Sequence, residues 1–443
     1  MRLDPFFKAR RIAVIGASRE RGKVGSVILK QLKNKKAYPV NPHAKRILGL
    51  KAYASVKEIP HKIDLAIIAT RAQTVPKILQ ECQEKNITHA IIVSAGFKEI
   101  GNELLQKELS EAIRKTNITV LGPNCLGVFD AHNRLDTLFL PEDRLKRPKP
   151  GGISFLSQSG ALGSAVLDLA AYKGYGFAKF ISYGNAENVT ASDILEFLAK
   201  DKDTKVICAY IEGIKDGKAF LKSAKKCKKP IIALKGGITK AGSSAAQSHT
   251  GALAGKKEIY YGAFKQAGII IAHNLEEVFI FASIFSTIKT KPRGKRVQII
   301  TNGGGYGIVT ADAIENRGLA LAKPGSAIKS LKKEMPEGVV AKNPFDLLGD
   351  ATNERYDKAI KAAMKDKNND AIVVVILPQT PRIDLSIKKT IIRASRKKEK
   401  PIVAVITGSE YSMSLRRALE KEKIPCFEYP EKAILALSAY LRS

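Results

Sequence analysis

Cysteine is scarce in this sequence, and its five residues lie far apart: Cys82, Cys125, Cys208, Cys227 and Cys426. Their number is odd and no CxxC pair occurs, so neither a disulfide framework nor a zinc knuckle is indicated. The six histidines are also scattered without the spacing of metal ligands, and we predict no metal site. A reducing, cytoplasmic location is expected.

Long apolar runs are absent as well. None approaches the roughly 20 residues that cross a bilayer. The segment Met1 to Arg11 carries charges and a proline where a secretory signal needs an apolar stretch. Because the chain has 443 residues, 44% of them hydrophobic, it is long enough for two or three domains with cores of their own. We expect a soluble protein with no membrane partner.

Acidic residues are in the minority: 42 Asp and Glu stand against 75 Lys and Arg, an excess of 33 positive charges. Such an excess could serve nucleic-acid binding, because that function requires phosphates to be neutralised. The basic residues gather in runs such as 33–36, 222–229 and 388–400, which we interpret as solvated helix faces. No aromatic-rich recognition motif accompanies them, so we predict no nucleic-acid partner. The excess has no specific explanation.

Three segments share one pattern: a short β-branched apolar run, a turn of small residues and the start of a helix. They begin at Arg11, Gly152 and Val297 and divide the chain into three similar lengths. Strands alternate with helices between them, which predicts an α/β fold of three consecutive doubly wound domains. We expect a Rossmann-like domain over 1–145 and two flavodoxin-like domains over 150–290 and 295–443. The linkers are predicted at 144–150 and 290–295.

The first of these turns contains Gly16, Gly22 and Gly25, and their spacing departs from the GxGxxG of dinucleotide-binding proteins. An NAD site would also need an acidic residue at the end of the second strand. Here that end is basic and contains Lys45 and Arg46. A basic end suits a ribose that carries a phosphate, as in coenzyme A or NADP. The alternative is that the glycines only make a tight turn.

Three further features form a coherent set for phosphoryl chemistry. His249 lies in a loop of small, almost uncharged residues. Glu212 stands at the carboxyl end of a predicted strand, where open α/β sheets meet their ligands. The second turn opens a helix whose free N–H groups would hold an anion; its residues are Ser157, Gln158, Ser159 and Gly160. The histidine would be the nucleophile, oriented by the carboxylate. The alternatives are an idle exposed histidine and a glutamate that pairs with a lysine.

Several motifs through nearly the whole chain point to one family. They are Tyr-Pro-Val-Asn-Pro (38–42), Ser-Ala-Gly-Phe-Lys-Glu (94–99), Leu-Gly-Pro-Asn-Cys-Leu-Gly (121–127), Ser-Gln-Ser-Gly-Ala-Leu-Gly (157–163), Ser-His-Thr-Gly-Ala-Leu-Ala-Gly (248–255), Thr-Asn-Gly-Gly-Gly (301–305) and Asn-Pro-Phe-Asp (343–346). With them the sequence resembles the alpha subunit of archaeal-type ADP-forming acetyl-CoA synthetases, relatives of succinyl-CoA synthetase.

The resemblance implies a ligase that interconverts acyl-CoA, phosphate and ADP with free acid, CoA and ATP. Phosphate would attack acyl-CoA to give acyl phosphate, and the phosphoryl group would move to His249, steadied by Glu212, before it reaches ADP. Phosphate would be held by Ser157 to Gly160 in the phosphohistidine domain, 150–290. The domain 295–443 would be a second ligase domain, whose turn at 302–305 looks like an anion site without an assigned ligand.

The resemblance also implies a CoA site in the domain 1–145. Its residues would be Gly16, Ser18, Lys23, Val24, Gly25, Asn41, Pro42, Lys45, Ser94, Ala95, Gly96, Phe97 and Asn124.

No ATP-grasp domain is recognised in the chain, so ADP or ATP, with Mg, is expected on a separate ATP-grasp beta subunit in an α2β2 heterotetramer. The loop around His249 would then have to swing between two sites. One alternative is a non-catalytic CoA- or acyl-CoA-binding regulator of the same fold. Another is an NADP-dependent oxidoreductase, for which we find no hydride-transfer site. The preferred acyl group stays open.

Overall fold

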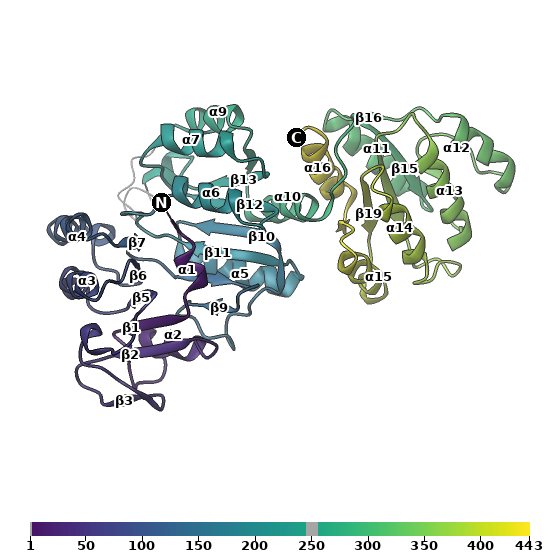
Figure 1. The fold of residues 1–443 in the computed structure, drawn as a ribbon. Coiled ribbons are helices and arrows are strands. Elements are labelled where there is room, and N and C mark those ends of the chain that lie inside the picture. Colours follow the sequence, from purple (N-terminus) through teal and green to yellow (C-terminus); the bar gives the residue numbers. More distant parts are fainter. Residues whose placement is uncertain (1, 245–255) are drawn as a thin grey trace. The chain divides into compact units, whose positions relative to one another are not determined.

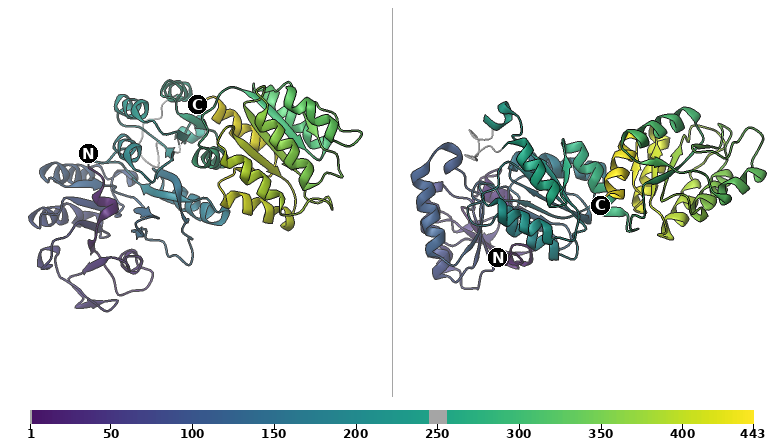
Figure 2. Two further views of the ribbon diagram at one scale, coloured as in Figure 1. Left: turned by 45° about the vertical axis from the view of Figure 1, so that its right-hand side comes forward. Right: turned by 90° about the horizontal axis from the view of Figure 1, so that it is seen from above.

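The structure is a computed structural model that describes residues 2–244 and 256–443. Two compact units make up the chain, Met1–Val278 and Phe279–Ser443, here called unit 1 and unit 2 (Figures 1 and 2). His249 lies outside the described residues. Over the described ranges, no helix combines the length and apolar character needed to span a bilayer.

Unit 1 begins with a five-stranded parallel sheet in the order β2-β1-β5-β6-β7. Its strands are β1 (Arg11–Ile15), β2 (Lys36–Val40), β5 (Leu65–Ile68), β6 (His89–Ile92) and β7 (Thr119–Leu121), and β3 (Arg46–Ile47) and β4 (Leu50–Lys51) form a separate hairpin. Its helices are α1 (Pro5–Lys8), α2 (Val24–Gln31), α3 (Val75–Glu84) and α4 (Glu103–Lys115). The chain reverses direction across the sheet between β2 and β5. The carboxyl ends of the strands at such a switch point are where doubly wound sheets bind ligands.

Both faces of this sheet are covered, because successive residues of β1 belong to different cores. Ala13 and Ile15 lie in the core that α3 and α4 cover, and these two helices lie side by side (Figure 1). Ile12 and Val14 lie in a second core on the other face. This explains why the strand reads as a continuous apolar run rather than an alternating one.

The second sheet of unit 1 has seven strands in the order β14-β13-β12-β10-β11-β8-β9. The strands are β8 (Val128–Asp130), β9 (Leu135–Asp136), β10 (Pro150–Ser157), β11 (Phe177–Ser182), β12 (Val206–Ile211), β13 (Ile231–Lys235) and β14 (Ile270–Ala272). Helices α5 (Gly160–Lys173), α6 (Ala191–Lys200), α7 (Gly217–Lys226) and α9 (Lys257–Gln266) accompany them. The five strands from β14 to β11 are parallel. The strand β8 is antiparallel to β11, and β9 is antiparallel to β8.

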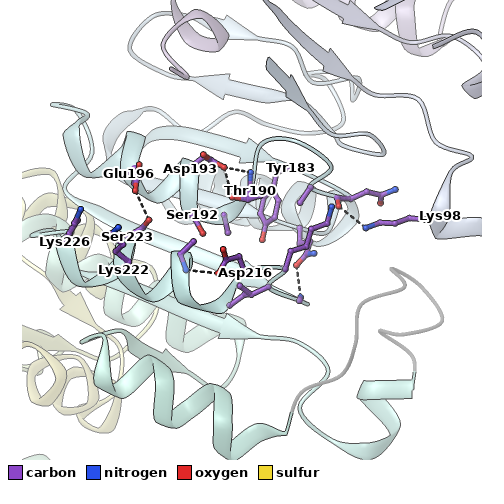
Figure 3. A pocket seen from close by; sticks show the side chains of 18 residues that line it. Lys98, Tyr183, Thr190, Ser192, Asp193, Glu196, Asp216, Lys222, Ser223 and Lys226 are labelled. Carbon is purple, nitrogen blue, oxygen red and sulfur yellow. Dashed lines mark hydrogen bonds between the residues drawn. The ribbon is translucent and has the colours of Figure 1, made fainter. Parts of the chain in front are cut away.

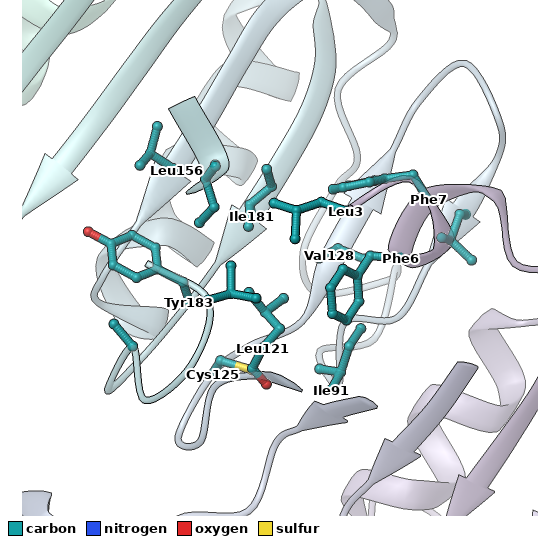
Figure 4. Packing of buried hydrophobic residues seen from close by; sticks show 14 of the residues in the cluster. Leu3, Phe6, Phe7, Ile91, Leu121, Cys125, Val128, Leu156, Ile181 and Tyr183 are labelled. Carbon is teal, nitrogen blue, oxygen red and sulfur yellow. The ribbon is translucent and has the colours of Figure 1, made fainter. Parts of the chain in front are cut away.

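One hydrophobic core joins the two sheets of unit 1 (Figure 4). Ile91 and Leu121 reach it from the first sheet, and Leu156 and Ile181 reach it from the second. Phe6 of α1 is fully buried in the same cluster. This shared core connects the sheets whose strands β1 and β10 lead into the two turns.

Unit 2 is a parallel sheet in the order β16-β15-β18-β19-β20, with β17 paired to β15. Its strands are β15 (Arg296–Thr301), β16 (Ala320–Leu321), β17 (Phe345–Asp346), β18 (Ala371–Ile376), β19 (Ile402–Ile406) and β20 (Cys426–Phe427). Helix α10 (Leu275–Thr287) leads into the unit, followed by α11 (Gly304–Asn316), α12 (Ser326–Leu331), α13 (Asn353–Lys365), α14 (Ile387–Arg396), α15 (Glu410–Lys421) and α16 (Pro430–Leu441). Every residue of β18 is buried.

The predicted α/β class with doubly wound parallel sheets is confirmed. The domain boundaries stay predictions. The strands β8 and β9 fall inside the predicted range 1–145 but belong to the second sheet. The strand β11 was not predicted, and its sequence contains a lysine, Lys179, in a central strand. Lys179 is in fact buried and forms ion pairs with Asp130 at 3.3 Å and Asp201 at 2.9 Å.

Candidate functional site

The turn between β1 and α2 requires two of its glycines. A Cβ added to Gly25 would lie 2.1 Å from the carbonyl oxygen of Gly16. Gly16 itself has a φ of +88°, and a Cβ there would lie 2.3 Å from the oxygen of Ala69. Helix α2 therefore begins directly against the turn, and Lys23 at its N-cap makes no side-chain cap bond. The first N–H groups of α2 are available to a phosphate group.

Asn41 holds this turn from the end of β2. Its Nδ2 donates to the carbonyl oxygen of Ala17 at 2.7 Å, and its Oδ1 accepts the N–H of His43 at 2.8 Å. Pro42 and Lys45, which were predicted beside it, are exposed. The side chain of Asn41 thus shapes the turn, and the two exposed residues are the ones a ligand could reach.

Ser18 and Lys23 also lie on the turn. The hydroxyl of Ser18 accepts the N–H of Glu20 at 3.1 Å, and Lys23 forms an exposed ion pair with Glu20 at 3.5 Å. Exposed pairs of this kind contribute little free energy, so Lys23 can change partner at low cost.

Ser94 connects three loops at the carboxyl edge of the first sheet. Its hydroxyl donates to the carbonyl oxygen of Thr70 at 2.7 Å and accepts the N–H of Thr70 at 3.2 Å. Its own carbonyl oxygen accepts the N–H of Asn124 at 2.9 Å. Asn124 has a φ of +55°, and its Nδ2 lies 3.4 Å from Oδ1 of Asn185.

Glu99 fixes the backbone of the next two predicted residues. Its Oε1 accepts the N–H groups of Gly96 at 2.5 Å and Phe97 at 3.1 Å, while its Oε2 accepts Nδ2 of Asn185 at 2.6 Å. Burial acts to raise the pKa of Glu99, but these hydrogen bonds hold it below its ordinary value. The ring of Phe97 is fully buried, so only its backbone could meet a ligand.

The second turn, between β10 and α5, is built around its serines. The hydroxyl of Ser157 donates to the carbonyl oxygen of Ser159 at 2.6 Å. Ser159 is the N-cap of α5 and accepts the N–H of Leu162 at 3.3 Å. This cap leaves the N–H groups of Gly160 and Ala161 at the start of a 14-residue helix, where they and the helix dipole favour an anion.

Gln158 links this turn to Glu212. Its Oε1 accepts the N–H of Glu212 at 2.8 Å and that of Gly213 at 3.0 Å. On the other side, the Nζ of Lys235 donates to the carbonyl oxygen of Glu212 at 2.8 Å and lies 4.4 Å from the ring centre of Tyr260. The backbone of Glu212 is therefore held from both sides.

Two buried oxygens beside this link lack partners. Among the described residues, neither Oε2 of Glu212 nor the hydroxyl of Tyr183 has a hydrogen-bond partner. Burial, and then the charge of Glu212, raise the pKa of Tyr183 well above its usual value and that of Tyr210 to about 12. Both phenols are therefore protonated at neutral pH and can donate. Buried polar groups without partners are costly, so an unsatisfied donor and acceptor here favour a ligand or side chain that pairs with them.

A cavity of about 710 Å³ in unit 1 brings the two predicted sites together; we call it the central cavity. Four residues predicted for CoA and three predicted for phosphate line it: Val24, Ser94, Ala95, Asn124, Gln158, Ser159 and Gly160. A thioester and a phosphate ion bound at these residues would share one space.

A second cavity of about 650 Å³ lies against α6 and α7 and shares Gln158 and Asn185 with the first (Figure 3). The ring of Tyr183 lines it, and its hydroxyl points in among the lining side chains. Lys98 is also in its lining; burial, and then the charge of Lys215, lower its pKa. Gln158, which holds the backbone of Glu212, therefore lines both cavities.

Sequence reasoning missed Glu99, Tyr183, Asn185 and Lys235, all of which hold or border the predicted site residues. Tyr183 and Asn185 follow β11, the strand that was not predicted. Recognising that strand would have placed both at the carboxyl edge of the second sheet. Glu99 stood inside a motif that was already singled out. Its bonds to Gly96 and Phe97 are local, whereas its bond to Asn185 crosses from one sheet to the other and leaves no sequence pattern.

Three family models match the chain. They are a CoA binding domain over residues 10–131, a succinyl-CoA ligase like flavodoxin domain over 150–285 and a ligase-CoA domain over 297–442.

Full-length relatives are similar as well. The chain is 40% identical to acetate–CoA ligase (ADP-forming) II subunit alpha of Pyrococcus furiosus, over 99% of this chain and 97% of the relative. It is 42% identical to an acetate–CoA ligase (ADP-forming) of Methanocaldococcus jannaschii and spans 61% of that longer protein. Among solved structures, the acetyl-coenzyme A synthetase 1 of Candidatus Korarchaeum cryptofilum, in complex with phosphate and ADP, superposes with a TM-score of 0.92 at 36% identity, over 99% of this chain and 96% of that one.

Proposed function

Because this chain belongs to the family of ADP-forming acetate–CoA ligases, we propose that it is the CoA- and phosphate-binding alpha subunit of an ADP-forming acyl-CoA synthetase. The reaction interconverts acyl-CoA, phosphate and ADP with free acid, CoA and ATP. The observation that supports this proposal is the central cavity, which is lined by four of the residues predicted for CoA and three of those predicted for phosphate.

The first step would take place in that cavity. Phosphate held at the start of α5 attacks the carbonyl carbon of the thioester, the C–S bond breaks, and CoA leaves as the thiolate. The free N–H groups at Gly160 and Ala161 would hold the phosphate by charge-assisted hydrogen bonds. The products are acyl phosphate and CoA.

In the second step, His249 would attack the phosphorus of the acyl phosphate and release the free acid. Glu212 would accept the N–H of the other ring nitrogen and so leave the attacking nitrogen unprotonated. The buried Oε2 of Glu212, which lacks a partner among the described residues, supports this role. The phosphoryl group would then pass to ADP.

The nucleotide would bind to a second polypeptide. Relatives of this length are named as alpha subunits, which supports a partner subunit. We propose that the partner is an ATP-grasp beta subunit that holds ADP and Mg, in an α2β2 assembly in the cytoplasm. The relatives are named as ligases, which favours the enzyme over the non-catalytic CoA-binding regulator.

Incubation of the chain and its partner subunit with ATP labelled at the γ-phosphate tests this function. We expect acid-labile, base-stable label on the wild type and none on His249→Ala. Equal labelling of the wild type and His249→Ala, or no labelling of either, would contradict the role of His249.

A further inference from the structure

The central cavity contains apolar side chains that neither CoA nor phosphate requires. Leu126, Phe139 and Leu140 are among them. In the proposed reaction the acyl carbon lies between the sulfur of CoA and the attacking phosphate, and both predicted sites border this cavity. The chain attached to that carbon must therefore extend into the same space.

Two side chains hold the backbone of Leu140, the residue that follows Phe139. The carbonyl oxygen of Leu140 accepts Nε2 of Gln31 at 3.0 Å and Nη2 of Arg147 at 2.8 Å. Arg147 in turn pairs through Nε with Asp136 at 2.7 Å, and the two side chains are only 8% and 15% exposed. Segment 144–150, predicted as a linker, therefore anchors the segment that faces the cavity. A surface fixed in this way can discriminate between substrates by shape.

The space beside these residues is larger than an acetyl group needs. The central cavity measures about 710 Å³, and an adjoining groove of about 1180 Å³ shares Val24, Phe139, Leu140 and Ser164 with it. Cavities of several hundred Å³ accommodate drug-sized ligands. The pantetheine end of CoA and an acyl chain of several carbons can therefore be accommodated together.

The lining of the central cavity also limits the charge of the acyl chain. Throughout the described part of the chain, every residue that lines this cavity is uncharged. A second carboxylate on the acid would lose its hydration without gaining an ionic partner, which is costly. The lining thus favours acids with a single carboxylate and an apolar chain.

We propose that Phe139 and Leu140 form the acyl-binding wall of this enzyme, and that its preferred acids are monocarboxylic acids with an apolar chain longer than that of acetate. This inference rests on the proposed function. It makes two chemical distinctions: apolar chains bind better than acetyl, and dicarboxylic chains bind worse than apolar chains of similar size.

Isothermal titration of the full chain with CoA, acetyl-CoA, isovaleryl-CoA and succinyl-CoA tests both distinctions. We expect isovaleryl-CoA to bind about tenfold more tightly than acetyl-CoA, because it buries additional methyl and methylene groups. Succinyl-CoA should bind more weakly than isovaleryl-CoA. Equal affinity for the three thioesters, or a preference for succinyl-CoA, would overturn the assignment of Phe139 and Leu140 as the acyl-binding wall.

Substitutions locate the effect. Leu140→Ala and Phe139→Ala should reduce the ratio of isovaleryl-CoA to acetyl-CoA affinity by about tenfold. Leu169→Ala is the control and should leave this ratio unchanged, because Leu169 lies on α5 and is 39% exposed. Each ratio is measured within one variant, so partial loss of folded protein cancels. An unchanged ratio in both wall variants would overturn the assignment. Failure of the wild type to bind CoA or any thioester would overturn the proposed function as well.

Discussion

Gln158 accepts the backbone N–H of Glu212 through its side-chain oxygen at 2.8 Å. The same oxygen accepts the N–H of Gly213, so one amide group positions the predicted carboxylate from within the predicted phosphate turn. The contact joins residues that are 54 positions apart in the sequence. It makes the phosphate turn and the glutamate a single structural element.

Gln158→Leu should break this element. Two backbone N–H groups would lose their acceptor, which costs about 1–3 kcal/mol for each that stays buried, and Glu212 would lose its fixed position. We expect a lower free energy of unfolding, measured in urea, and a loss of the labelling of the enzyme by ATP labelled at the γ-phosphate. Gln158→Glu is the matched control. It keeps the acceptor oxygens and should retain most of the stability, but its charge should weaken phosphate binding. Equal stability of wild type and Gln158→Leu would contradict the link.

Tyr183→Phe should separate activity from stability. The variant removes a buried hydroxyl that has no partner among the described residues, so the free energy of unfolding should be unchanged or slightly higher. Labelling of the enzyme should nevertheless slow, since the cavity beside Glu212 loses its donor. Thermal unfolding and labelling rates on the same sample measure both effects.

Tyr356→Phe in unit 2 is the control for that variant. The hydroxyl of Tyr356 donates to the carbonyl oxygen of Val375 at 2.6 Å and to Oδ1 of Asn302 at 2.9 Å. Its removal takes away a buried hydrogen bond, although Oδ1 of Asn302 keeps the N–H of Leu377 at 2.9 Å, and should cost about 1 kcal/mol. If Tyr183→Phe lost as much stability, its hydroxyl would have a structural partner after all.

Gly25→Ala should abolish CoA binding, because the new methyl group would collide with the carbonyl oxygen of Gly16 and displace the start of α2. Gly22→Ala is the informative comparison. Gly22 has a φ of +91° with no atom within 4 Å of an added Cβ, so alanine adds only backbone strain of about 1 kcal/mol. Calorimetric titration with CoA should show binding by the second variant alone. Binding by both would place CoA away from this turn.

Acidification should weaken unit 2 through Asp370. Its hydrogen bonds from Arg296, opposed by partial burial, hold the pKa of Asp370 below its ordinary value of 3.8. A depressed folded pKa adds stability that is fully present above pH 3.8 and is lost as the pH falls toward the folded pKa. The difference in free energy of unfolding between wild type and Asp370→Asn should therefore be largest near neutral pH and shrink below 3.8. Urea unfolding at several pH values measures it, and a difference that widened in acid would have the wrong sign.

The sequence was sufficient for the fold class because several central strands are continuous apolar runs that end at turns of small residues. Alternation of such runs with helices leaves few arrangements. The strand β11 could not be found in this way, since Lys179 interrupts its apolar pattern and only the three-dimensional structure brings Asp130 and Asp201 to it.

The candidate site was predictable to the extent that single turns carry it. Gly16, Gly25 and Ser159 have local reasons to be where they are, because they permit close approach or cap a helix. The bond between Glu99 and Asn185 joins segments that follow different sheets, and no short motif encodes such a contact. All of the site assignments stay predictions, and Pro42 and Lys45 are the exposed residues among those near the end of β2.

The hairpin of β8 and β9 affects how this protein can be cut. It precedes the predicted domain boundary near residue 145, yet it pairs with the sheet whose other strands follow that boundary. Cleavage there would release an N-terminal fragment with an orphaned ribbon and leave the other fragment with a bare strand edge, the surface that drives non-native association. A strand pair from the first half of unit 1 thus belongs to the sheet of the second half. We therefore expect unit 1 to unfold in a single cooperative transition.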